Sequence, residues 1–211
     1  MQQTFLILTL MASCLLVACE ERADTPNEQP AGDAVDLADV PMRADAVDML
    51  GKRLNLADVE WLDPDSGAFL DPPKAILVRW WTDTCPFCAM SLPAIEQLRT
   101  QFREGGLRTL AVYHPKPPRA VPAEDVLRRA RELGYRGPVA ADLRWETLRE
   151  LYLDAGTRHS TSVSFLLDPD GVIRYVHPGP AFGPSEDPAQ RQYDEDYRNL
   201  TAAIRAMLQR P

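Results

Sequence analysis

The chain has few basic residues, few histidines, few cysteines and no long hydrophobic run. It carries 23 Lys and Arg against 31 Asp and Glu, a net charge of −8, so it lacks the basic surplus that nucleic-acid binding requires. Residues 20–45 hold eight of the acids and two arginines, a charge of −6, which leaves −2 for the rest. A hydrophobic content of 45% is typical of a globular protein. We expect one near-neutral domain with additional segments and no nucleic-acid partner.

The longest apolar run is Phe5–Ala18, with 14 residues. A bilayer span needs about 20 residues, so this run fits the hydrophobic region of a secretory signal instead. It ends at Leu16-Val17-Ala18-Cys19, which resembles the bacterial lipoprotein cleavage box. The resemblance implies cleavage before Cys19, lipidation of Cys19 and a periplasmic protein anchored to a bacterial membrane. No Lys or Arg precedes the run, so an ordinary secretory signal remains the alternative.

Cysteine is scarce, and its placement narrows the chemistry. Of four cysteines, Cys14 lies in the predicted signal and Cys19 at the lipidation position, which leaves Cys85 and Cys88 for the folded domain. Disulfides persist outside the cytoplasm, but bridging so short a loop stabilises a fold little. A redox-active dithiol and half of a metal site are the two readings left.

The pattern along the chain divides it into three parts. We predict a signal peptide at residues 1–18, an acidic flexible tether at 19–45 and a folded domain at 46–211. Apolar periodicity within the domain predicts strands at 56–62, 75–81, 107–114 and 138–142, a hairpin within 162–179, and helices at 88–102, 123–134, 145–151 and 197–207. This order predicts an α/β fold with a central mixed sheet and helices on both faces.

Cys85 and Cys88 lie where a predicted buried strand gives way to a helix. Unpaired N–H groups and the positive end of the helix dipole gather there and favour a thiolate. Cysteines in such places have pKa values of about 3.5–7.5, and the thiolate is the form that attacks a disulfide. Cys88 begins the apolar stripe of the helix and should face inward. The pattern predicts that Cys85 attacks and that Cys88 resolves the mixed disulfide.

Two segments resemble the thioredoxin superfamily. "ILVRWWTDTCPFCAMSLPAIEQL" is similar to its active-site segment, including Pro93 after the second cysteine, and "SFLLDPDGVIRYVHPG" is similar to its C-terminal hairpin, with Gly179 at the active-site glycine. Together with the lipoprotein signal, the chain resembles TlpA/ResA-type lipid-anchored thiol-disulfide oxidoreductases. The resemblance implies a thioredoxin-like fold, a redox-active Cys85–Cys88 disulfide without further cofactor, and reduction as the favoured direction. It also implies protein thiols or disulfides and a membrane electron-exchange protein as partners.

The chain departs from that family at positions that tune or guard the site. Ser162 stands where the family has a cis-proline that blocks metals and shapes the docking edge, so we expect Thr161 and Ser162 to keep this edge with a free N–H and less rigidity. Arg79 stands where thioredoxins have a buried acid; it would either favour the thiolate or pair with a local acid. Pro86, between the cysteines, is a further tuning or docking candidate.

The three histidines, His114, His159 and His177, all lie near strand ends that a thioredoxin-like fold would bring towards the cysteines. Imidazole titrates near neutrality, so His114 and His177 are candidates for proton transfer or for tuning Cys85. A loop histidine is more commonly an ordinary surface or hydrogen-bonding residue, and this is the alternative for each of them.

Two other members of the superfamily offer alternatives. Sco-type copper chaperones place a histidine before the hairpin, which makes Cys85, Cys88 and His159 an alternative copper site, although the spacing of both motifs differs by one residue. Peroxiredoxins need a proline and an arginine at the places of Val78 and Ser162. A binding module with an inert CPFC motif is a further alternative, which the intact pair at a helix N-terminus disfavours.

Overall fold

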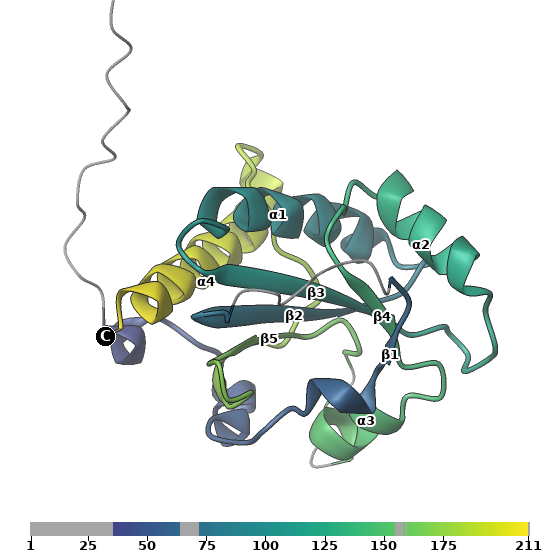
Figure 1. The fold of residues 1–211 in the computed structure, drawn as a ribbon. Helices are drawn as coiled ribbons and strands as arrows, with labels where there is room; N and C mark the ends of the chain where they lie inside the picture. The colour runs from purple at the N-terminus through teal and green to yellow at the C-terminus, as the bar shows by residue number, and fades with distance from the viewer. Residues whose placement is uncertain (1–35, 64–71, 155–157, 159, 211) are drawn as a thin grey trace, which may run out of the picture. The chain divides into compact units, whose positions relative to one another are not determined.

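The computed structural model describes residues 36–63, 72–154, 158 and 160–210. Its strands are β1 (Glu60–Trp61), β2 (Ala75–Trp81), β3 (Leu107–Tyr113), β4 (Val139–Ala141), β5 (Ser164–Leu167) and β6 (Ile173–His177). They form one sheet in the order β1-β4-β3-β2-β5-β6 (Figure 1). β3 pairs in parallel with β2 and β4, whereas the remaining pairs are antiparallel. The sheet is mixed, as the element order predicts.

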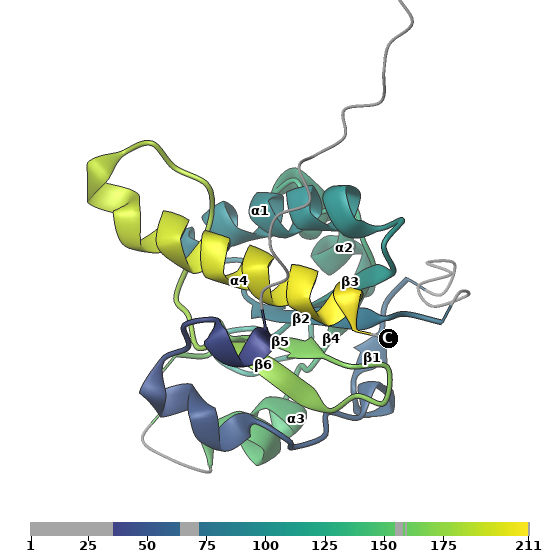
Figure 2. The same cartoon turned by 90° about the vertical axis from the view of Figure 1, so that its left-hand side faces the viewer.

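The helices cover both faces of this sheet. They are α1 (Pro86–Phe102), α2 (Ala123–Glu132), α3 (Glu146–Leu148) continued by a π-helical turn (Arg149–Leu153), α4 (Arg191–Gln209), and short 3₁₀ turns at Leu37–Asp39, Ala44–Met49, Leu56–Asp58 and Pro188–Gln190. Figures 1 and 2 show α1, α2 and α4 on one face, and the Ala44–Met49 turn with α3 on the other. Within the described residues, no helix combines the length and the apolar character of a membrane span.

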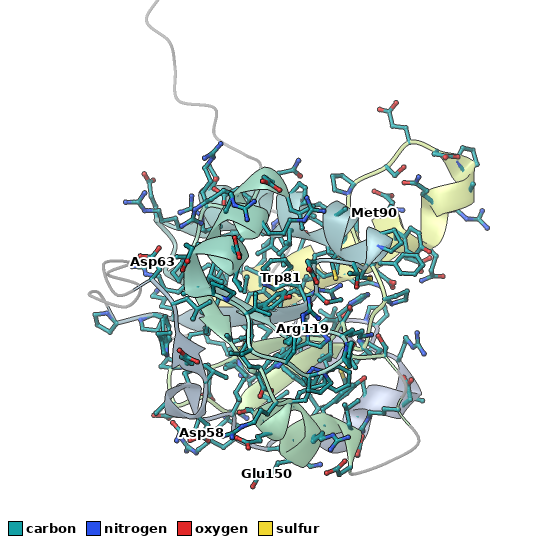
Figure 3. The ribbon with its side chains drawn as sticks, turned by 90° about the vertical axis from the view of Figure 1, so that its right-hand side faces the viewer. Asp58, Asp63, Trp81, Met90, Arg119 and Glu150 are labelled. Carbon is teal, nitrogen blue, oxygen red and sulfur yellow. The ribbon has the colours of Figure 1, made fainter. Side chains whose placement is uncertain are left out.

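Successive side chains of β2 point to opposite faces of the sheet, and each face carries its own hydrophobic layer. Leu77 and Trp81 pack with the buried faces of α1, α2 and α4, whereas Val78 and Trp80 pack on the opposite face with Met49. Figure 3 shows Trp81, at the end of β2, inside the domain. Every residue of β2 is buried, as expected for a central strand covered on both sides. Every side chain of β2 therefore contacts protein atoms rather than solvent.

Two sequence predictions need correction. The strand predicted at residues 56–62 is shorter: a 3₁₀ turn occupies Leu56–Asp58 and only Glu60–Trp61 form β1, because the side chain of Asn55 accepts a hydrogen bond from the N–H of Ala57 and caps the turn. The folded part of the chain also reaches into the segment assigned to the tether. Val40 is buried, and the carbonyl of Pro41 accepts a hydrogen bond of 3.1 Å from the hydroxyl of Tyr175. Apolar residues spaced within the acidic composition hold this segment to the domain.

Candidate functional site

Cys85 is the residue that caps the N-terminus of α1, directly after the turn that follows β2. Its side chain is half-buried. This burial acts to raise the pKa of the thiol, but the N–H of Cys88, the Cys88 thiol, the N–H of Phe87 and the hydroxyl of Ser162 outweigh it, and the pKa lies below its ordinary value. Two of these groups, the N–H groups of Cys88 and Phe87, are those expected at a helix N-terminus, whereas the Ser162 hydroxyl reaches the site from the turn before β5. Cys85 is therefore the more acidic and more accessible thiol of the pair.

Cys88 lies one turn further along α1 and is fully buried. Burial raises the pKa of its thiol, although the charge of Arg79 and the hydroxyl of Ser162 act in the opposite direction. Cys85 and Cys88 are free thiols in this structure. The environments of the two thiols differ in the direction that the sequence predicts for an attacking and a resolving cysteine.

Ser162 closes the site from the opposite side. Its hydroxyl lies 3.4 Å from the sulfur of Cys88. Its carbonyl oxygen lies so close to Gly179 that a Cβ atom at position 179 would be only 2.4 Å away from it. Gly179 has φ +90°, a conformation that L residues rarely adopt. Glycine is therefore required at position 179 for two independent reasons, and it allows the turn after β6 to approach the turn before β5.

Arg79 points from β2 into this site and is fully buried. Nη1 donates to the carbonyl of Ser162 at 2.8 Å and to the hydroxyl of Ser164 at 3.2 Å. Nη2 donates to the carbonyl of Pro180 at 2.6 Å and to the hydroxyl of Ser91 at 3.3 Å. The sequence left two roles open for Arg79, and pairing with a local acid is not found within the described residues. The groups whose negative charge would act to raise the pKa of Arg79 are Cys88 and Cys85.

His177 is buried at the end of β6, where it contacts a carboxylate. Its Nε2 lies 3.2 Å from Oδ2 of Asp196 on α4, and its ring packs edge-on against Phe182 at 5.0 Å. Burial lowers the pKa of His177 despite Asp196, so the ring is neutral at pH 7. His177 and Arg79 share Phe182 as a neighbour, because the guanidinium of Arg79 lies 5.2 Å from the centre of the same ring.

His114 is buried at the end of β3, but it packs edge-on against Trp145 at 5.3 Å. Burial, together with the charge of Lys116, lowers the pKa of this histidine to about 3. Neither ring nitrogen has a hydrogen-bond partner in the structure. A neutral imidazole of this kind is a poor proton carrier near pH 7.

The surface beside Cys85 is partly apolar. Pro86 and Thr84 are exposed, and Phe87 is 38% exposed while its ring lies 6.2 Å from that of Tyr193 on α4. Thr161 is buried, and its hydroxyl has no hydrogen-bond partner. Of the docking candidates, Pro86 is thus open to a partner, whereas the side chains of Thr161 and Ser162 face inward.

Three residues that contact Arg79 or His177 were not identified from the sequence: Ser91, Asp196 and Phe182. Ser91 accepts hydrogen bonds from Arg79 and from the N–H of Phe182, and donates to the carbonyl of Phe87. It stands three residues after Cys88 on the buried face of α1, and Asp196 stands four residues before the buried Leu200 on α4. A polar residue in an apolar stripe was the available signal in both helices.

The copper alternative depends on His159, which lies outside the described residues. Among the residues that are described, no group of three or more His, Cys, Asp or Glu side chains is placed to hold a metal ion. Cys19 and the lipidation motif also lie outside the described part of the chain.

Comparison with known sequences places the chain in a family. The model of the AhpC/TSA family matches residues 64–176, more than half of the chain, and this stretch includes both Cys85 and Cys88. A search of curated protein sequences found no match.

Solved structures share the fold at low identity. A candidate thiol:disulfide interchange protein DsbE from Chlorobium tepidum matches with a TM-score of 0.50 at 20% identity, over 75% of this chain and 97% of its own. A candidate protein disulfide isomerase from Bacteroides thetaiotaomicron matches with a TM-score of 0.54 at 17% identity, over 76% and 91%. A hypothetical protein from Sinorhizobium meliloti matches with a TM-score of 0.53 at 22% identity, over 75% and 84%. The predicted thioredoxin-like fold is confirmed.

Proposed function

Because the chain belongs to the AhpC/TSA family and has a thioredoxin-like fold, we propose that it is a thiol-disulfide oxidoreductase that reduces protein disulfides in the cell envelope through Cys85 and Cys88. The observation that carries the proposal is the unequal environment of the two thiols. Cys85 is accessible and has a lowered pKa, whereas Cys88 is buried and has a raised pKa. Efficient exchange needs one thiolate exposed to the partner and a second thiol withheld from it.

The cycle uses both sulfur atoms in turn. The Cys85 thiolate attacks one sulfur of a partner disulfide, which forms a mixed disulfide and releases the other partner sulfur as a thiolate. Cys88 then loses its proton and attacks the sulfur of Cys85, which forms the Cys85–Cys88 disulfide and releases the second partner thiolate. Two electrons have passed to the partner, so a membrane dithiol protein must return two electrons before the next cycle. No cofactor takes part in these steps.

Partner proteins would approach over the N-terminus of α1. Pro86 and Phe87 are exposed there, and the backbone at Thr161 and Ser162 lies on the other side of the thiols, with the Ser162 hydroxyl contacting Cys88. We assign the cell envelope and a lipid anchor at Cys19 from the sequence pattern of residues 5–19. A tether between residue 19 and the domain would let the site reach proteins at the membrane surface.

Trapping the mixed disulfide tests the exchange role. In a Cys88→Ser variant the second step is blocked, so partner proteins are expected to accumulate on Cys85 and to be released by reductant. A Cys85→Ser variant is the matched control and should trap nothing. Absence of any adduct that requires Cys85 would overturn the proposal.

Two further measurements on the same purified domain would detect the alternative activities. Tight stoichiometric Cu(I) that is lost in a His159→Ala variant would establish copper delivery instead. Peroxide consumption that depends on Cys85 would establish a peroxidase, which the residues at Val78 and Ser162 disfavour.

A further inference from the structure

Arg79 is a fully buried cation for which the described residues supply no carboxylate. The oxygen atoms to which its guanidinium donates are all neutral: those of Ser162, Ser164, Ser91 and Pro180. Its Nε has no hydrogen-bond partner. Buried charges in proteins are normally paired, because an unpaired charge loses its hydration without compensation. Neutral oxygens and the face of Phe182 compensate that loss only in part.

A second buried arginine of the chain shows the ordinary solution. The side chain of Arg158 is 7% exposed and forms an ion pair with Asp48. It also stacks on the ring of Tyr152 at 4.7 Å, much as Arg79 lies over Phe182. The two sites therefore differ in the carboxylate, which Arg158 has and Arg79 lacks, and in depth, because Asp48 is half-exposed whereas Arg79 is fully buried.

The titratable groups that feel the charge of Arg79 are Cys88 and Cys85 on α1, His177 on β6 and His114 after β3. Both histidines are held neutral by burial. The carboxylate of Asp196, on α4, contacts His177 rather than Arg79. The anion available to Arg79 is therefore the thiolate of the reduced pair: the carbonyl of Ser162 accepts from Arg79 at 2.8 Å, and the hydroxyl of the same serine lies 3.4 Å from the sulfur of Cys88.

We propose that Arg79 is a positioning residue that stabilises the thiolate of the reduced pair and thereby shifts the Cys85–Cys88 couple towards its reduced form. This inference rests on the proposed exchange function. Reduction breaks the S–S bond, takes two electrons from a partner dithiol that becomes a disulfide, and leaves a thiolate and a thiol after one proton is taken up. The disulfide form offers Arg79 no anion, so its charge is uncompensated in the oxidised state.

This shift selects the class of disulfide that the protein can reduce. A couple whose reduced form is stabilised has a higher reduction potential and is a weaker reductant. Strained or exposed disulfides have high potentials, whereas structural disulfides have low ones. The expected substrates are therefore labile, catalytic or mixed disulfides, and structural disulfides should remain intact.

The reduction potential, measured by equilibration with glutathione, tests the role of Arg79. Arg79→Gln should lower the equilibrium constant for reduction of the pair about tenfold, which corresponds to about 30 mV. Arg79→Lys keeps a cation and should lie between the two. Arg158→Gln removes the matched buried arginine and should destabilise the fold without changing the potential. An unchanged potential in a folded Arg79→Gln variant, with normal exchange in the wild type, would overturn this inference alone.

Two measurements support the same test where a variant folds poorly. In a Cys85→Ser background, the pKa of Cys88 should rise by about one unit when Arg79 is also replaced by Gln. In the wild type, the reduced protein should resist urea better than the oxidised protein, and the reverse order would contradict the inference. A wild type that forms no reversible Cys85–Cys88 disulfide would instead defeat the proposed function.

Discussion

The sulfur of Cys88 and the hydroxyl oxygen of Ser162 lie 3.4 Å apart, in a buried contact between α1 and the turn before β5. The carbonyl of the same serine accepts a hydrogen bond from Arg79 at 2.8 Å. Ser162 therefore joins the resolving thiol to the buried cation. A proline, which the resemblance to the thioredoxin superfamily implies at this position, would keep the carbonyl but lose the hydroxyl.

Replacement of this hydroxyl should slow the thiol chemistry. Ser162→Ala removes a group that acts to lower the pKa of both cysteines. One hydrogen bond contributes about 1 kcal/mol, so alkylation of Cys85 at pH 7 should slow about fivefold. The rate is measured against pH with the Cys88→Ser background as the starting protein.

Thr161→Val is the control for that experiment. The Thr161 hydroxyl is buried without a partner, so its replacement by a methyl group should leave the alkylation rate unchanged and the stability equal or higher. Equal slowing in the two variants would show that the effect arises from packing.

Gly179→Ala should strongly destabilise the domain. The new Cβ would lie 2.4 Å from the Ser162 carbonyl oxygen in a backbone with φ +90°, and strain of this kind costs about 1–3 kcal/mol before the clash is counted. Gly51→Ala is the matched control, because φ is +81° but nothing lies within 4 Å. Urea unfolding should show a clearly larger loss for Gly179→Ala, and equal losses would contradict the predicted clash.

Phe87→Ala should weaken the reaction with protein partners. Phe87 lies between the cysteines and is 38% exposed, and aromatic residues buried at an interface often contribute about 2 kcal/mol or more. We expect kcat/KM for a protein disulfide to fall about thirtyfold, with little change for a small-molecule disulfide. Leu50→Ala, at a residue 41% exposed elsewhere on the surface, should change neither value. An equal fall for both substrates would place Phe87 in the chemistry rather than in docking.

The stability of the domain should decline on mild acidification because of His114. Its pKa falls from 6.5 to about 3 on folding, so the unfolded chain binds a proton below pH 6.5 that the folded protein does not. The contribution of this histidine is complete above pH 6.5 and is lost as the pH falls, by at most about 1.4 kcal/mol per pH unit. His114→Phe should reduce the pH dependence of the free energy of unfolding in urea, and His177, whose pKa is also lowered by burial, should account for part of what is left. An unchanged slope would mean that other groups dominate.

The sequence was sufficient for the local part of the site. The β2 prediction at residues 75–81 matches the observed strand, and the helix after it begins at Pro86. Apolar periodicity reports which side of an element is buried, and the change of period from strand to helix fixes where Cys85 falls. The half-exposed Cys85 and buried Cys88 follow from that local pattern. The strand predicted at residues 56–62 is observed only as the two-residue β1, because a polar cap at Asn55 starts a 3₁₀ turn in its first half.

Tertiary structure decided what surrounds the two thiols. Arg79 meets Ser162 and Pro180 across 83 and 101 residues of chain, and His177 meets Asp196 from another helix. Periodicity shows that such side chains are buried but not which oxygen or sulfur they reach, because partners are set by sheet order and by turns such as that at Gly179. The sequence by itself therefore determined the position of the two thiols and which of them is buried. The fold alone decided that the buried arginine lies beside thiols rather than beside an acid.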